Sequence, residues 1–252
     1  MIKKVYAKIV SIEKIAKETM KMVLENEHIS QFAKPGQFVH IKVADHTLRR
    51  PISIAETNVE TNTFTILFKT VGSGTRRLAS YEAGEYLDLL GPNGTGFPLD
   101  RVEENDVILL IGGGIGVPPV YFLAKELTRL NVNVHAILGF QSKDYVFYEE
   151  EFKQWNDVTI VTDDGSYGKK GFVTDYVHDI NGIDRYFACG PLPMLKAVKE
   201  ELEGVEGYLS FEERMGCGIG ACYACVIPTN TKDKYKKICQ DGPVLHANEV
   251  KL

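Results

Sequence analysis

At 252 residues the chain is long for one domain and long enough for two. Its hydrophobic content of 44% and charged content of 25% are ordinary for a globular protein with a sizeable core. The formal net charge of −5 and the lack of a basic run argue against nucleic acid as the main partner. No stretch approaches the roughly 18 apolar residues of a membrane span, and the first residues lack a signal-peptide core. We therefore expect a cytoplasmic protein without a membrane segment.

The first hundred residues predict β structure built from short strands. Apolar and polar residues alternate with period two, and turns rich in Gly, Pro and Asn separate the alternating segments. One short helix is expected over residues 75–80. Many short strands with such turns are typical of an antiparallel barrel or sandwich. The expected strands are 4–10, 20–24, 38–43 and 63–69, and the turns are 35–36, 61–62, 72–74 and 91–94.

From Asp106 onward the pattern changes to strands that alternate with helices. Residues 107–111 form a continuous apolar run, which is typical of a strand buried on both faces. Strand–helix repetition of this kind predicts a parallel, doubly wound sheet. Further strands are expected at 133–139, 158–161, 185–189 and 204–211, and helices at 118–130, 148–155, 173–180 and 191–202.

A binding motif lies inside the β-rich part. Arg50-Pro51-Ile52-Ser53 follows the turn Pro35-Gly36-Gln37-Phe38, and Gly74-Thr75 opens the short helix. Taken alone, the tetrapeptide equally suits a strand that starts after a turn. In this order, the set resembles the flavin domain of the ferredoxin-reductase superfamily.

That resemblance implies an FAD site. Arg50 offers a forked cation for a pyrophosphate, and Ser53 offers a hydroxyl to the N5 edge of the isoalloxazine ring. Gly74 and Thr75 present backbone N–H groups at a helix start, where phosphate is favoured. The strand of Leu67 lines FAD in this family. The expected FAD contacts are therefore Arg50, Pro51, Ile52, Ser53, Leu67, Phe68, Lys69, Gly74 and Thr75.

A second motif, Gly112 to Pro119, links the buried strand at 107–111 to a helix. It is not a strict G-x-G-x-x-G turn because Val117 stands at the last position, and alone it equally suits tight helix–sheet packing. The turn Cys189-Gly190-Pro191-Leu192-Pro193-Met194 resembles the superfamily's turn beside the nicotinamide ring. The resemblance implies an NAD site at Gly113, Gly114, Gly116, Cys189, Gly190 and Pro191, with Cys189 as a small neighbour rather than a nucleophile.

The choice between NADH and NADPH depends on charge. A 2′-phosphate usually needs an Arg after the second strand of the sheet, and residues 140–144 contain none. Asp163 and Asp164 after the third strand would repel a further phosphate. NADH is therefore the favoured nucleotide.

Four of the five cysteines lie near the end of the chain, at Cys217, Cys222, Cys225 and Cys239. The spacing C-x4-C-x2-C, followed by a gap of thirteen residues, is the plant-type ligand pattern of a [2Fe–2S] cluster. Neighbouring glycines permit the tight turns that bring thiols together. A structural zinc site usually needs two short Cys pairs, and only one is present here. Zinc and unligated thiols remain the alternatives. The six histidines are scattered without ligand spacing.

The whole chain, motifs included, resembles the electron-transfer subunits of type 1B dihydroorotate dehydrogenases. This resemblance predicts an FAD-binding barrel at 1–101, an NAD-binding α/β domain at 102–210 and a [2Fe–2S] subdomain at 211–252. The resemblance implies electrons that pass from the FMN of a catalytic partner through [2Fe–2S] and FAD to NAD⁺, in a heterotetramer with two copies of each chain. The alternatives are a subunit of an NADH-dependent ferredoxin:NADP oxidoreductase, a sulfhydrogenase gamma subunit, or a zinc-stabilised binding module.

Overall fold

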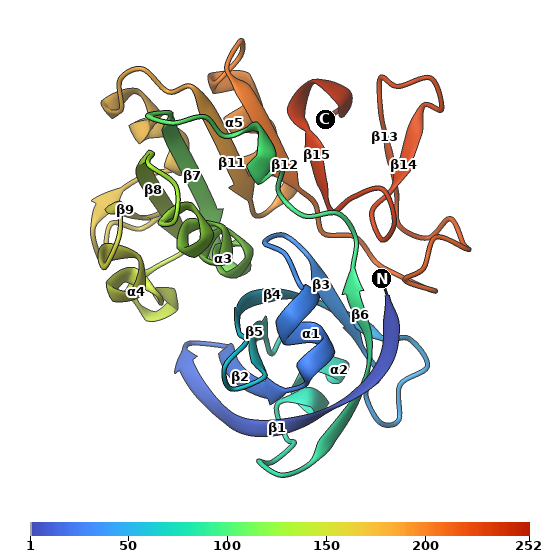
Figure 1. Cartoon of the computed structure of the whole chain (residues 1–252). Coiled ribbons are helices and arrows are strands. Elements are labelled where there is room, and N and C mark those ends of the chain that lie inside the picture. The colour runs from blue at the N-terminus through green and yellow to red at the C-terminus, as the bar shows by residue number, and fades with distance from the viewer. Residues whose placement is uncertain (1) are drawn as a thin grey trace.

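Six antiparallel strands close into a barrel in the order β1-β2-β5-β4-β3-β6 (Figure 1). The computed structural model describes residues 2–252. Inward-facing side chains such as Ala7, Ile9, Leu24 and Ile66 are fully buried, while their neighbours along the strands face outward. The strands are β1 (Lys3–Ala16), β2 (Thr19–Glu25), β3 (Phe38–Ile41), β4 (Arg50–Asn58), β5 (Thr63–Lys69) and β6 (Tyr86–Asn93).

Two short helices accompany the barrel, α1 (Glu27–Phe32) and α2 (Ser73–Leu78). The Asn26 side chain caps α1, because its Oδ1 accepts a hydrogen bond from the Ile29 N–H at 3.0 Å. Ile29 is fully buried and packs into the barrel core. The helix therefore covers part of that core.

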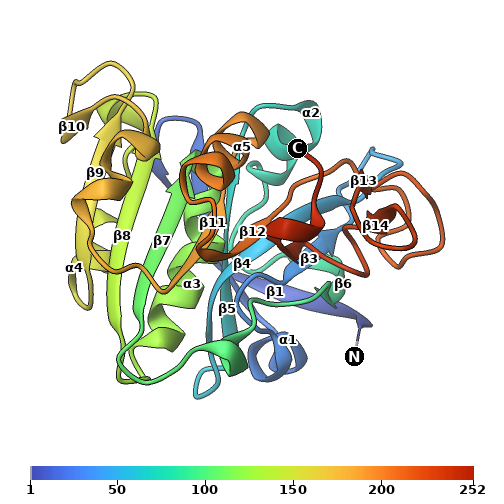
Figure 2. The ribbon, with the colours of Figure 1, turned by 90° about the horizontal axis from the view of Figure 1, so that it is seen from above.

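The second unit is an open, mostly parallel seven-stranded sheet in the order β10-β9-β8-β7-β11-β12-β15 (Figure 2). Its central strands carry apolar residues that are buried on both faces. The strands are β7 (Val107–Gly113), β8 (Asn133–Phe140), β9 (Asp157–Thr162), β10 (Lys169–Lys170), β11 (Arg185–Cys189), β12 (Glu206–Ser210) and β15 (Val244–His246).

Helical segments cover both faces of this sheet, as a doubly wound fold requires. One face packs with α3 and α4, and the other packs with α5 and a 3-10 helix, η4. The helices are α3 (Val117–Leu127), α4 (Glu149–Lys153), α5 (Leu192–Glu201), η1 (Leu99–Arg101), η2 (Gly114–Gly116), η3 (Lys143–Tyr145), η4 (Val173–Asp179) and η5 (Ala247–Glu249).

Helix α3 joins the barrel to the sheet. Phe122 on α3 is buried in the barrel core, whereas Leu123 packs with the sheet. Lys125 forms an ion pair with Glu56 on β4, with 2.9 Å between Nζ and Oε2. The two units are therefore held by one shared apolar layer with a half-buried ion pair at its edge.

The last part of the chain leaves β12, forms a long loop and a small hairpin of β13 (Val226–Pro228) and β14 (Tyr235–Lys237), and then returns to the sheet. Its final strand, β15, pairs antiparallel with β12. Figure 1 shows this segment beside both the barrel and the sheet. The cysteine-rich segment therefore contacts both units at one side of the molecule.

The predicted fold class, an antiparallel barrel followed by a doubly wound sheet, is confirmed. Three local predictions are wrong. The sequence analysis missed α1, placed a turn at residues 91–94 where β6 continues to Asn93, and placed an ordinary helix where η4 lies. Two of the errors have a tertiary cause, because barrel closure extends β6 and packing against β8 accompanies the tighter helix, whereas α1 is too short to show a helical period. Within residues 2–252, no helix has the length and apolar character needed to span a membrane.

The pairing of β11 with β12 depends on Gly207, which lies opposite Tyr186 in the strand register. A Cβ at position 207 would overlap the ring of Tyr186, which is only 1% exposed. We expect Gly207→Ala to lower the free energy of unfolding by about 1–3 kcal/mol through overpacking, measured by urea unfolding. Adding Tyr186→Leu should recover part of that loss. Equal stability of wild type and Gly207→Ala would contradict this account.

Candidate functional site

The four C-terminal cysteines come together as two pairs. The side chain of Cys217 lies beside that of Cys222, and the side chain of Cys239 lies beside that of Cys225. Cys225 and Cys239 are buried, while Cys217 and Cys222 are half-buried. The loop therefore has one inner pair and one outer pair of thiols.

Backbone N–H groups point at these sulfurs. Cys217 Sγ accepts from the N–H of Ile219 at 3.5 Å and of Cys222 at 3.3 Å, and Cys239 Sγ accepts from the N–H of Gly220 at 3.1 Å. Burial opposes ionisation of Cys217, but the backbone hydrogen bonds outweigh it and lower its pKa to about 6. Burial, with a hydrogen bond to Cys225, raises the pKa of Cys239 to about 12. The outer pair therefore carries the more readily formed thiolate.

This donor set suits a two-iron cluster. Among residues 2–252, no three His, Cys, Asp or Glu side chains converge on a point where one metal ion would sit. A single tetrahedral zinc needs four converging ligands, whereas a [2Fe–2S] cluster takes two thiolates on each iron. Two separate thiol pairs under N–H donors therefore fit the cluster better than zinc.

The cysteine loop packs directly on the barrel. A Cβ at Gly218 would overlap the imidazole of His40 on β3, so only glycine fits this contact. Asn93 on β6 donates from Nδ2 to the Gly218 carbonyl at 2.9 Å. His40 is fully buried, and neither ring nitrogen has a hydrogen-bond partner among the described residues. Burial and the nearby charge of Arg49 lower the pKa of His40 to about 4. The ring is therefore neutral at physiological pH.

The predicted flavin motif occupies the start of β4. Residues 50–53 are its first four residues and are half-buried. The Arg50 guanidinium lies against Gly74 of α2, where a Cβ would lie 2.5 Å from Nη2, and it also bonds the Leu48 carbonyl. Ser53 lies on the same face of β4 as Ala55, which packs with the α3 layer. The motif thus gathers a cation, a hydroxyl and the first turn of α2, which includes half-buried Thr75, on the barrel side that faces the sheet.

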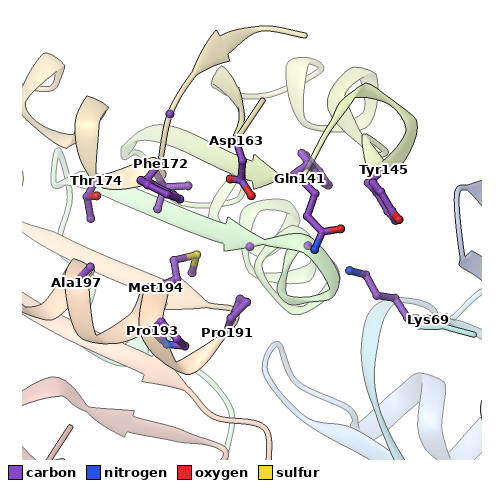
Figure 3. Close-up of a pocket in the computed structure, with 16 residues that line it drawn as sticks. Lys69, Gln141, Tyr145, Asp163, Phe172, Thr174, Pro191, Pro193, Met194 and Ala197 are labelled. Atoms are coloured by element: carbon purple, nitrogen blue, oxygen red, sulfur yellow. The ribbon is translucent and has the colours of Figure 1, made fainter. Parts of the chain in front are cut away.

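Residues 67–69, the third segment predicted to contact FAD, have side chains in different environments. Leu67 and Phe68 are each 1% exposed, and their side chains pack into the two hydrophobic cores. Lys69 instead points into a cavity between barrel and sheet (Figure 3). Its Nζ would lie 3.3 Å from a Cβ at Gly114, and it lies 5.6 Å from the Tyr145 ring centre. Lys69 therefore lines this cavity together with residues of the sheet.

That cavity has a volume of about 460 Å³ and lies at the carboxyl edge of the sheet. Cys189 pairs with Gly112 in the strand register, so the turns after β7 and β11 meet at this edge. The strand order reverses direction at these two strands, which is where doubly wound sheets bind nucleotides. The walls of the cavity include Gly113, Gly114, Pro191, Met194, Asp163 and Phe172 (Figure 3).

The remaining predicted nucleotide residues have packing positions. A Cβ at Gly116 would lie 2.6 Å from the Gly190 nitrogen, and a Cβ at Gly190 would lie 2.5 Å from Met194 Cε. Cys189 is fully buried, and burial raises the pKa of its thiol far above the ordinary range. Gly116, Cys189 and Gly190 therefore hold the two turns together, whereas Gly113, Gly114 and Pro191 face the cavity.

Sequence reasoning missed several residues of this arrangement. Tyr145 and Phe172 line the cavity, and His40 and Asn93 support the cysteine loop. Only Tyr145 had a local signal, since it follows the second strand of the sheet closely. The others reach their positions through contacts between segments far apart in the chain.

Two family models match the chain. Residues 212–251 match the iron-sulfur cluster binding domain of dihydroorotate dehydrogenase B, and residues 110–200 match the oxidoreductase NAD-binding domain. A relative from Bacillus velezensis is 48% identical over 99% of this chain and 100% of its own length. One from Fusobacterium nucleatum is 46% identical over 94% of this chain and 95% of its own. Both are named dihydroorotate dehydrogenase B (NAD(+)), electron transfer subunit.

Solved structures are similar as well. A chain of an NADH-dependent reduced ferredoxin-NADP oxidoreductase aligns with a TM-score of 0.88 and 31% identity, over 97% of this chain and 89% of that chain. A ferredoxin NADP⁺ reductase from Neisseria gonorrhoeae with bound FAD and NADP aligns with a TM-score of 0.67 and 17% identity, over 79% of this chain and 90% of that chain. The second likeness shows the fold alone.

The low pKa of His40 predicts a pH dependence of stability. The unfolded imidazole titrates near 6.5, so between pH 6.5 and pH 4 the unfolded state binds more protons and stability falls as the pH falls. From pH 7 to pH 5 we expect the free energy of unfolding of wild type to fall by about 2 kcal/mol more than that of His40→Leu. Urea unfolding at both pH values measures this difference. Parallel pH profiles would contradict it.

Proposed function

The chain belongs to the family of dihydroorotate dehydrogenase B (NAD(+)) electron transfer subunits, and we propose that it carries electrons from a catalytic partner subunit to NAD⁺. It is then an oxidoreductase subunit in the oxidation of dihydroorotate to orotate, a step of pyrimidine biosynthesis. One observation carries the proposal: the loop with two thiol pairs packs on β3 and β6, beside the β4 motif of the same barrel.

The chain divides into three ranges, one for each cofactor. We assign FAD to 1–101, NAD to 102–210 and the [2Fe–2S] cluster to 211–252, with β15 of the last range completing the sheet of the second. When bound, FAD supplies the conversion between single electrons, which a [2Fe–2S] cluster carries, and the electron pair of a hydride. The residues named below would hold these groups.

The cluster ligands are Cys217, Cys222, Cys225 and Cys239. Strand β3 forms the wall between them and the flavin motif, because His40 touches Gly218 on one side and pairs with Pro51 on the other.

For FAD, Arg50 binds the pyrophosphate and Ser53 donates toward the ring edge, with Pro51, Ile52, Gly74 and Thr75 shaping the site. Leu67 and Phe68 support the site from the core, since their side chains are buried elsewhere. Apart from its bond to the Leu48 carbonyl, the Arg50 guanidinium has no carboxylate partner among residues 2–252, so its charge is available to a pyrophosphate.

For NAD, the cavity beside Gly113, Gly114 and Pro191 takes the nicotinamide nucleotide. Lys69 crosses from the barrel to face Gly114 and supplies a positive charge for the pyrophosphate. Gly116, Cys189 and Gly190 position the turns behind it. Asp163 lines the cavity, and its carboxylate disfavours an additional phosphate, which supports NADH over NADPH.

The catalytic partner covers the exposed side of the cysteine loop. Apolar side chains there are open to solvent: Ile219 is 54% exposed, Tyr223 62% and Tyr235 40%. A cluster of this kind beside a redox loop marks a protein-binding surface. We propose an FMN-containing partner, two copies of each chain, and the reducing cytoplasm as the location.

A ferredoxin:NADP oxidoreductase subunit is the alternative, given the 0.88 TM-score to such a chain. Identity favours the first proposal, at 46–48% against 31%. Purification with an FMN-containing, orotate-forming chain supports it. Purification with a chain that reduces NADP through ferredoxin instead contradicts it.

Replacing one cysteine of the outer pair tests the role of the cluster separately from that of the flavin. We expect Cys222→Ser to abolish iron and acid-labile sulfide and to lower dihydroorotate-dependent NAD⁺ reduction by about 100-fold or more, because a thiolate ligand is lost. NADH oxidation by an artificial dye should remain near wild type. Cys189→Ser is the control and should keep its iron. Unchanged coupled activity in Cys222→Ser would refute the relay.

Removing the Arg50 guanidinium should weaken FAD binding. A hydrogen bond to a charged group contributes about 1.5–3 kcal/mol, so Arg50→Ala should raise the Kd of FAD by about 10- to 100-fold. Flavin fluorescence on dilution measures this. Arg77→Ala removes the same charge from α2, where Arg77 bonds Ser80, and should bind FAD normally. Full flavin retention in Arg50→Ala would contradict the assignment.

A further inference from the structure

One lysine reaches across the cysteine loop. Lys237 is the last residue of β14, and its Nζ donates to the carbonyl oxygen of Gly220 at 2.6 Å. Gly220 lies between Cys217 and Cys222, whereas Lys237 lies two residues before Cys239. A charge-assisted hydrogen bond therefore links the two ligand-bearing segments.

The lysine is held firmly at both ends. Its backbone N–H donates to Asp241 Oδ2 at 2.8 Å, and β14 pairs it with Val226. Its ammonium group lies 4.2 Å from the ring centre of Tyr223. Within residues 2–252, no carboxylate lies within 4.0 Å of this ammonium group. The positive charge is therefore left to act on the loop.

The carbonyl that Lys237 binds belongs to the peptide group between Gly220 and Ala221. The N–H of that same peptide faces the sulfur of Cys217, and the N–H of Gly220 donates to Cys239 Sγ at 3.1 Å. Binding a cation at the carbonyl polarises the N–H of the same peptide group. Gly220 has φ of +79°, a left-handed conformation that favours glycine.

We propose that Lys237 is a positioning residue for the iron–sulfur cluster, which orients and polarises the Gly220 peptides and raises the cluster's reduction potential. The inference rests on the proposed function, since it assumes the four-cysteine cluster. Hydrogen bonds to sulfur and nearby positive charge both stabilise the reduced, more negative cluster. Lys237 supplies the charge directly and strengthens the hydrogen bonds through one peptide group.

The test compares three variants of the full chain in complex with its partner. Lys237→Met removes the charge but keeps an apolar stem, and Lys237→Arg keeps the charge. Lys236→Met is the matched control, because Lys236 is the neighbouring residue of β14 and pairs with Glu249 at 2.5 Å instead of the loop. Iron and acid-labile sulfide are counted, and the potential is measured by redox titration of the electron paramagnetic resonance signal.

We expect Lys237→Met to keep its iron and to have a more negative potential, with the ratio of reduced to oxidised cluster at a fixed potential lower by about threefold or more. Lys237→Arg should lie near wild type, and Lys236→Met should shift much less. Loss of iron in Lys237→Met alone also supports a holding role.

An iron-loaded Lys237→Met with the wild-type potential and spectrum overturns the proposal. Equal shifts, or equal iron loss, in Lys236→Met and Lys237→Met overturn it too, because net charge or hairpin stability alone would then explain the effect. A wild-type complex without iron would instead contradict the proposed function itself. The two failures are therefore distinguishable.

Discussion

The return of the chain to the sheet after Cys239 is the constraint on which the arrangement of sites depends. Strand β15 pairs with β12, and the N–H of Phe211 donates to the Pro243 carbonyl at 2.9 Å. On the barrel side, the N–H of Thr95 donates to the Gly242 carbonyl at 2.5 Å. A single short segment is thus bonded to both larger units. The cysteine loop, which starts and ends at these anchors, has its place fixed relative to the flavin strand and the nucleotide turns.

The cysteine loop and the cavity at the sheet edge use the same physical device to handle negative charge. At the cysteine loop, backbone N–H groups face sulfur and one lysine binds the intervening carbonyl. At the sheet edge, a glycine turn exposes its backbone and Lys69 faces it from the barrel. In each case, backbone dipoles orient the bound anionic group, and one lysine supplies a positive charge. The cation comes from a different segment than the dipoles, so each site exists only in the folded chain.

Local patterns predicted the regular elements well where a short window carries the whole signal. The bounds of β5 and β11 agree with prediction, because alternation and a continuous apolar run each depend on a few adjacent residues. The α1 helix was missed because its six residues are too few for a helical period. Residues 173–179 carry helical spacing, yet they form a 3-10 helix under packing against the sheet.

The sequence by itself determined the chemistry of this protein: four thiols at cluster spacing, an arginine and serine ahead of a glycine helix start, and glycines after a buried strand. Residue type and spacing are enough to predict this chemistry, because the sequence fixes which side chains are available as ligands. The tertiary structure alone decided the pairing of the thiols, the direction of Lys69, which glycines face the cavity and which pack, and the burial of His40 against Gly218. These depend on contacts between residues up to about two hundred positions apart, because barrel closure and strand order, rather than any local pattern, bring them together.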